Sequence, residues 1–167
     1  ARSCAAEVER EKARQRTRDA MLARAKRGLV TGGVVFGYRN KPVYSGTDAS
    51  GNPIRSHVEL EIAHAEAEVV RSIFRMFVAG YGLKAIARTL NGDPRYALES
   101  ERYFGGRRVP PPRKGSGSWA PSGVNTMLQN ERYRGIIVWG RYRNTDRGGR
   151  TRVRVAQDPS SWIRVEV

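Results

Sequence analysis

Arginine is the residue type of this sequence with the clearest chemistry, because a guanidinium group binds phosphate or carboxylate oxygens through paired hydrogen bonds. The basic residues are concentrated in segments 10–27, 102–114 and 132–154, whereas residues 58–68 carry acidic side chains. The three basic segments contain Arg10, Lys12, Arg14, Arg16, Arg18, Arg24, Lys26 and Arg27; Arg102, Arg107, Arg108, Arg113 and Lys114; and Arg132, Arg134, Arg141, Arg143, Arg147, Arg150, Arg152 and Arg154. Three basic patches around a more neutral middle predict binding of a polyanion.

The net charge narrows the class of partner. The 167 residues include 31 Lys and Arg against 16 Asp and Glu, which gives a formal charge of +15. Such an imbalance destabilises a compact chain through self-repulsion, and nucleic acid, an anionic membrane surface or an acidic protein would offset it. No apolar run approaches the roughly 20 residues that span a bilayer, and the polar start does not resemble a signal peptide. We therefore expect no membrane partner. A GC-rich genome could explain the preference for Arg over Lys, but not the charge.

A metal or catalytic site is the main alternative, and its residues fit it poorly. His57, Glu59, Glu61 and His64 lie close in sequence, but His64 falls outside the period of two that the glutamates follow, and no HExxH motif is present. The single cysteine, Cys4, permits neither an internal disulfide nor a cysteine-based zinc site. We predict surface roles for these residues and expect no catalytic residue, metal or cofactor.

The basic patches must be carried by regular elements, of which the first is a helix. Residues 5–27 contain neither Pro nor Gly and many good helix formers, so they predict a long helix that Gly28 ends. Its apolar positions are too sparse to bury the helix in a core of its own. Residues 31–38 predict tight turns, and residues 39–58 predict a hairpin-like loop.

Two amphipathic helices are predicted next, over residues 66–79 and 83–90. The Gly-Tyr-Gly corner between them is typical of the opening of a helix-turn-helix pattern. Residues 92–118 are rich in Pro, Gly and basic residues and predict a long, mobile loop.

The remainder predicts one more helix and a small β element. Residues 122–129 have helical spacing, with Ser122 as a possible N-cap. Residues 136–139 predict a strand, and residues 152–155 alternate as a second strand that a Gly148-Gly149 turn could join to the first.

The order of these motifs is more specific than any one of them. The basic helix precedes GGVVFGY (32–38), EAEVVRSIF (66–74) and GLKAIA (82–87). They are followed by Leu90-Asn91 and by Ser118-Trp119 with Val124, Leu128, Asn130, Tyr133 and Gly135. From about Glu7 to Gly135 the chain resembles the recombinase domain of the large serine recombinases, the phage integrases and transposon resolvases.

The resemblance implies a fold class and a domain organisation. We expect a mainly α protein with a small β element, in which a long N-terminal helix precedes a helix-turn-helix-like DNA-binding domain. Residues 1–28 would be the end of the helix from an absent catalytic domain, residues 29–135 the recombinase domain, and residues 136–167 a β-rich edge leading toward an absent zinc ribbon. The fragment would not be an enzyme, although its cytoplasmic, bacterial or phage-encoded parent would recombine DNA and self-associate.

The resemblance also implies which residues bind an attachment half-site on duplex DNA. The helix over 122–129 would be offered to the major groove, with Ser122, Asn125, Thr126 and Gln129 reading bases. Phosphate contacts would come from Arg107, Arg108, Arg113, Lys114, Arg132 and Arg134, while Arg24, Lys26 and Arg27 would follow the backbone or enter the minor groove. Each of these residues could instead be an ordinary solvated side chain. A basic structural protein that binds RNA or DNA in general is the alternative function.

Overall fold

The computed structural model describes residues 2–147 and 151–166, and these residues form two compact units. One unit consists of residues 33–130. The other combines the segment up to residue 32 with the segment from residue 131 onward. Each unit is described by itself.

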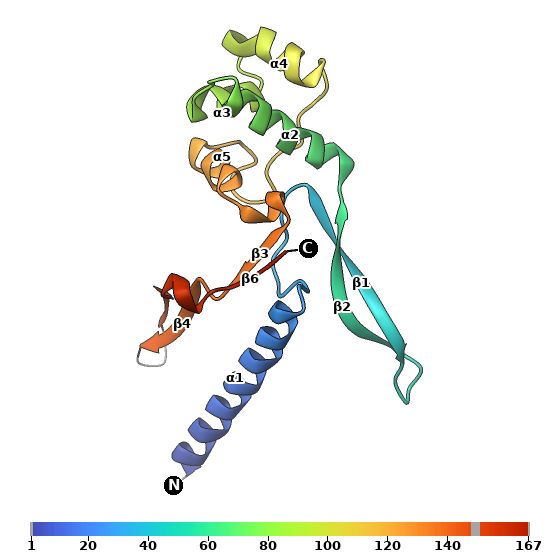
Figure 1. Ribbon diagram of the computed structural model, residues 1–167, viewed down its shortest axis with the longest axis vertical. Helices are drawn as coiled ribbons and strands as arrows, with labels where there is room; N and C mark the ends of the chain where they lie inside the picture. The colour runs from blue at the N-terminus through green and yellow to red at the C-terminus, as the bar shows by residue number, and fades with distance from the viewer. Residues whose placement is uncertain (1, 148–150, 167) are drawn as a thin grey trace. The chain divides into compact units, whose positions relative to one another are not determined.

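The unit of residues 33–130 begins with an antiparallel hairpin of β1 (Tyr38–Thr47) and β2 (Pro53–Ile62), shown in Figure 1. Cross-strand partners share a face of the sheet, so Arg39 and Lys41 lie opposite Glu61 and Glu59 on one face. Apolar residues dominate the other face, where the pairs are Tyr38 with Ile62, Asn40 with Leu60, and Pro42 with Val58. Pairs of opposite charge on one face and apolar pairs on the other thus fix the register of the two strands.

Four helices form the core of this unit: α2 (His64–Val78), α3 (Leu83–Leu90), α4 (Ala97–Phe104) and α5 (Pro121–Leu128) (Figure 1). Their apolar residues recur at helical spacing, so each helix presents one stripe inward. Ile73 and Met76 of α2, Ile86 of α3 and Val124 of α5 have no exposed surface. The short 3-10 helix η1 (Pro94–Tyr96) leads into α4.

An amide side chain joins the end of α3 to the segment that precedes α5. The Asn91 Nδ2 donates to the carbonyl oxygen of Trp119 at 2.9 Å, and the Trp119 backbone N–H donates to the Asn91 Oδ1 at 2.8 Å. The Trp119 ring is buried, donates from Nε1 to the Pro110 carbonyl at 3.2 Å and meets the edge of Phe36 at 5.1 Å between centroids. The start of α5 is therefore fixed by specific bonds.

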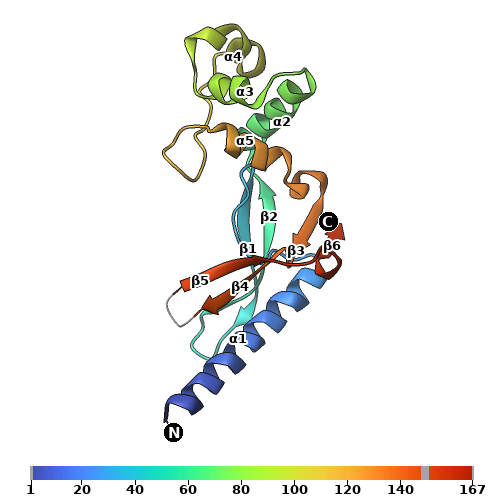
Figure 2. The same cartoon turned by 90° about the vertical axis from the view of Figure 1, so that its left-hand side faces the viewer.

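The second unit pairs a long helix with short strands (Figure 2). Helix α1 (Arg2–Lys26) contacts the sheet formed by β3 (Ile136–Trp139) and β6 (Ile163–Glu166), with Ala25 and Ile137 buried. A separate hairpin pairs β4 (Tyr142–Arg147) with β5 (Thr151–Ala156). The 3-10 helices η2 (Glu131–Arg134) and η3 (Pro159–Ser161) connect these elements. The Glu131 carboxylate accepts hydrogen bonds from Arg141 and, at 3.0 Å, from Arg164.

The expected fold class, mainly α with a small β element, is wrong. The described residues form six strands in three two-stranded sheets beside five α-helices. The helix-turn-helix-like arrangement is not found either, because residues 91–120, with η1 and α4, separate α3 from α5 instead of a short turn. Strand β3 and most of β5 were expected, but the extent of β1 and β2 was missed because most of their side chains are exposed, so polar residues interrupt the alternation that identifies a half-buried strand.

Smaller corrections concern the ends of elements and the pairing of strands. The expected loop over 92–118 contains η1 and α4, and α5 begins at Pro121 with Ala120, not Ser122, as its N-cap. Strand β3 pairs with β6 and not with β5. The Gly148-Gly149 turn lies outside the described residues.

Replacement of Asn91 by alanine tests the bond between α3 and the α5 segment. We expect Asn91→Ala to lower the free energy of unfolding by about 1–3 kcal/mol, because it leaves the N–H and C=O of a buried residue without partners. Urea unfolding followed by circular dichroism measures this loss, and Asn144→Ala, at an exposed position of β4, is the control. Equal stability of the two variants would show that the Asn91 bonds contribute nothing.

Candidate nucleic-acid interface

One face of α5 is polar and faces outward, while the opposite face anchors the helix. Val124 and Met127 are buried in the core of the unit. Ser122, Thr126 and Gln129 are exposed and Asn125 is half-buried. Since these four residues follow the i, i+3, i+4, i+7 spacing, they lie on the same side of α5 and its C-cap. The structure therefore brings together the four residues expected to read bases.

The hydrogen bonds along this face leave amide groups available to a ligand. The Thr126 hydroxyl donates to the Ser122 carbonyl at 2.9 Å, and the Gln129 Nε2 donates to the Asn125 Oδ1 at 3.4 Å. No other hydrogen bond is assigned to the Asn125 and Gln129 amide groups among the described residues, so Asn125 Nδ2 and Gln129 Oε1 can point a donor and an acceptor outward. An adjacent donor and acceptor is the pair that an adenine edge requires.

The segment between α4 and α5 carries four of the predicted phosphate-binding residues, which differ in how they are held. Arg108 and Lys114 are exposed. The Arg107 Nε donates to the Phe104 carbonyl at 3.1 Å, next to the left-handed Gly105 that ends α4. Among the residues that the structure describes, no hydrogen bond or ion pair is given to the exposed side chains of Arg108 and Lys114.

Arg113 holds this segment to the start of α2. Its Nε and Nη2 donate to the two carboxylate oxygens of Glu66 at 2.8 and 2.7 Å, and Nη2 also donates to the Tyr38 carbonyl at 2.8 Å. Glu66 accepts in addition the backbone N–H of Gly37 at 2.7 Å. Gly37 has a φ of 90°, and a Cβ there would lie 3.2 Å from a Val70 methyl group, so glycine is required for this approach. The sequence gave no sign of the pairing of Glu66 with Arg113, which are 47 residues apart.

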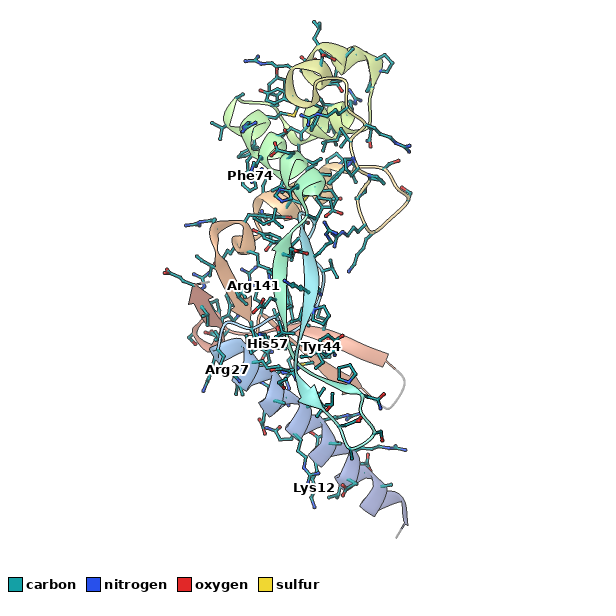
Figure 3. All side chains as sticks on the ribbon, turned by 90° about the vertical axis from the view of Figure 1, so that its right-hand side faces the viewer. Lys12, Arg27, Tyr44, His57, Phe74 and Arg141 are labelled. Carbon is teal, nitrogen blue, oxygen red and sulfur yellow. The ribbon has the colours of Figure 1, made fainter. Side chains whose placement is uncertain are left out.

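The remaining predicted residues lie in the other unit. Arg24, Lys26 and Arg27 are exposed at the end of α1, where Gly28 with a φ of 70° terminates the helix (Figure 3). In η2, Arg134 is exposed, whereas Arg132 is half-buried and desolvation lowers the pKa of its guanidinium. These positive charges at a helix end and a short turn can contact phosphates.

Of the four residues considered for a metal site, Glu59, Glu61 and His64 are exposed and His57 is half-buried. The His57 Nε2 lies 3.4 Å from Glu59 Oε1 and its Nδ1 lies 3.1 Å from the Ser56 hydroxyl, on the exposed hairpin of Figure 3. Over the described residues, no group of three or more His, Cys, Asp or Glu is arranged to hold a metal ion. Over the same residues, no helix is both long and apolar enough to cross a bilayer.

Comparison with known proteins gives one match. A family model described as Recombinase matches residues 64–167, which cover α2 to α5 and the C-terminal strands. No curated protein and no solved structure matches the chain.

The pairing of Arg113 with Glu66 generates a prediction about stability. We expect Arg113→Gln to lower the free energy of unfolding by about 1–2 kcal/mol. The Glu66 carboxylate is partly shielded from water and would lose the guanidinium that donates two hydrogen bonds to it. The exposed Arg108→Gln, which removes the same charge, should leave thermal unfolding unchanged. Wild-type stability of Arg113→Gln would contradict the role given to this ion pair.

Proposed function

The chain belongs to the Recombinase family, which confirms the resemblance in its sequence motifs, and from this premise we propose that it binds duplex DNA at an attachment half-site within a site-specific serine recombinase. We assign a binding role to this chain. We assign the chemistry of strand cleavage to none of its residues. The family membership supports a part in DNA recombination. The DNA contacts below are our proposal.

The observation that carries the proposal is the polar face of α5 on a buried anchor. Asn125 and Gln129 offer donors and acceptors toward solvent, while Val124 allows α5 little freedom to move. Groups that discriminate between base pairs must be held in position, because a hydrogen bond to a base edge tolerates little displacement. We propose that Ser122, Asn125, Thr126 and Gln129 contact base edges in the major groove.

The basic residues near and beyond this helix would provide the part of the affinity that does not depend on sequence. Arg108 and Lys114 have the strongest case, because they are exposed and have no assigned partner among the described residues. We propose phosphate contacts also for Arg107, Arg113, Arg132 and Arg134, and backbone or minor-groove contacts for Arg24, Lys26 and Arg27. Arg113 would act mainly by holding the segment that carries Arg108 and Lys114.

Substitution of the amide side chains on α5 tests sequence readout. The duplex selected by the wild-type chain from a random library is compared with its scrambled version. We expect Asn125→Ala and Gln129→Ala each to reduce the discrimination between the two by about 1–3 kcal/mol, because a base contact is lost. Asn40→Ala, at an exposed position of β1, is the control and should keep full discrimination.

Two outcomes of that measurement would reject the proposal. Equal binding of the wild-type chain to both duplexes would remove sequence readout. Preference for double-stranded RNA would favour the alternative function, a basic RNA-binding protein, because A-form RNA hides its base edges in a narrow major groove.

Substitution of basic residues should act differently from substitution of amides. We expect Arg108→Gln combined with Lys114→Gln to weaken binding to both duplexes by the same factor and to reduce the slope of log K against log salt by about 2, one unit for each lost phosphate contact. The matched control is Arg39→Gln with Lys41→Gln, which removes the same charges from β1. An equal change in the control would mean that only the net charge matters.

A further inference from the structure

A basic groove lies within the second unit, between the middle of α1 and the strands β3 to β5, and the predicted DNA contacts do not include it. Its volume is about 1370 Å³. The residues that line the groove include Arg14, Arg18, Arg141, Tyr142, Arg143 and Arg154. Figure 2 shows α1 running beside the strands of this unit. Residues that are far apart in the sequence thus form one concave, positively charged surface.

The charge of this groove is hardly compensated from within. Five arginines line it, and Glu11 is the acidic residue among the lining residues. Glu11 lies 3.4 Å from Arg14, and both side chains are mostly exposed. No ion pair is assigned to Arg18, Arg143 or Arg154 among the side chains that the structure describes. Like charges in a concave surface raise the local potential, and a bound polyanion would relieve their repulsion.

Aromatic rings hold two of the groove's arginines in place. The Arg154 guanidinium lies over the Tyr142 ring, 3.7 Å from its centroid, and Arg141 lies over Trp162 at 5.1 Å. Arg141 also donates to the Glu131 carboxylate, so Arg154 is the stacked arginine that can serve an anion from outside. A guanidinium stacked on a ring keeps its N–H groups in the plane of the fork, from which they can donate outward. The cost of ordering a flexible side chain on binding is reduced accordingly.

The stacking also indicates which anion fits. A single-stranded nucleic acid binds by stacking its bases on free aromatic faces, but one face of Tyr142 is occupied by Arg154. Paired N–H donors on fixed arginines suit the oxygens of phosphate groups. Duplex DNA presents phosphates at short, regular intervals to a surface of this kind. The face of Tyr142 that Arg154 covers is therefore closed to a base, and the fixed donors of Arg154 favour the phosphates of a nucleic-acid backbone.

We propose that this groove is a second DNA-binding surface, which binds the sugar–phosphate backbone of duplex DNA through Arg18, Arg143 and Arg154. The inference rests on the proposed function for the nature of the partner, but it uses residues that the proposed function does not, in the unit that does not contain α5. The groove would add affinity without reading sequence. Its contribution can therefore be separated from that of α5.

The experiment removes the three arginines together from the whole 167-residue chain. In Arg18→Gln/Arg143→Gln/Arg154→Gln, we expect binding to a mixed-sequence duplex to weaken roughly 10–100-fold at moderate salt and the salt slope to fall by about 2–3. The matched control is Arg39→Gln/Arg55→Gln/Arg75→Gln, which removes the same charge from exposed positions outside the groove and outside the three basic segments, and it should change affinity much less. Circular dichroism verifies that both variants are folded.

A variant that keeps the charge tests the stacking itself. Tyr142→Ala removes the ring under Arg154, and we expect it to weaken duplex binding as much as Arg154→Gln does. Equal losses in the groove triple variant and its control would overturn the proposal, as would no loss in either. Tighter binding of the wild-type groove to an unpaired DNA strand or to polyglutamate than to the duplex, lost in the triple variant, would also overturn it. The discrimination between selected and scrambled duplexes that Asn125 and Gln129 provide is measured separately. The proposal for the groove can therefore be rejected while the proposed function stands.

Discussion

The mutual packing of α2, α3 and α5 is the interaction on which the rest of the candidate interface depends. The three helices contact one another, and Ile73, Ile86 and Val124, one from each, have no exposed surface. In a chain with a formal charge of +15, this small apolar core must offset both chain entropy and charge repulsion. The polar face of α5 is defined only because its other face is fixed in this core. Readout of bases by that face would thus rest on packing that is remote from the bases.

Carboxylates are the second constraint, because the chain has few of them and uses several at more than one contact. Glu66 accepts from Arg113 and from the Gly37 backbone, and Glu131 accepts from Arg141 and Arg164. Side-chain and backbone hydrogen bonds with Arg95 lower the pKa of Asp93 to about 2 and keep that carboxylate charged. Since one carboxylate can hold two donors, a few acidic residues fix loops and strand ends in a chain that keeps a net charge of +15.

Sequence patterns predicted the helices that bury an apolar stripe, and they also predicted α1 from its helix-forming residues and β3 and β5 from their apolar or alternating residues. Helices α2, α3 and α5 lie within a few residues of their expected bounds because their buried residues recur at helical spacing. Helix α4 was missed because it is short, flanked by Pro94 and Gly105, and leaves Leu98 exposed. The pairing of β3 with β6 depends on contacts between distant residues, for which local patterns carry no signal. The same limit applies to the groove, whose lining joins α1 to strands at the other end of the sequence.

The role of an arginine in this chain follows from what surrounds it and not from the local density of charge. Arg113 lies in a basic, proline-rich segment, yet it is fully engaged by Glu66, which is 47 residues earlier. Arg154 lies in a β-hairpin that the sequence barely distinguishes, yet Tyr142 holds it at the edge of a groove. A carboxylate neutralises an arginine and turns it into a structural bond, whereas an aromatic ring orients it and leaves its charge in place. The second arrangement leaves a guanidinium able to bind an anion from outside, as we propose for Arg154.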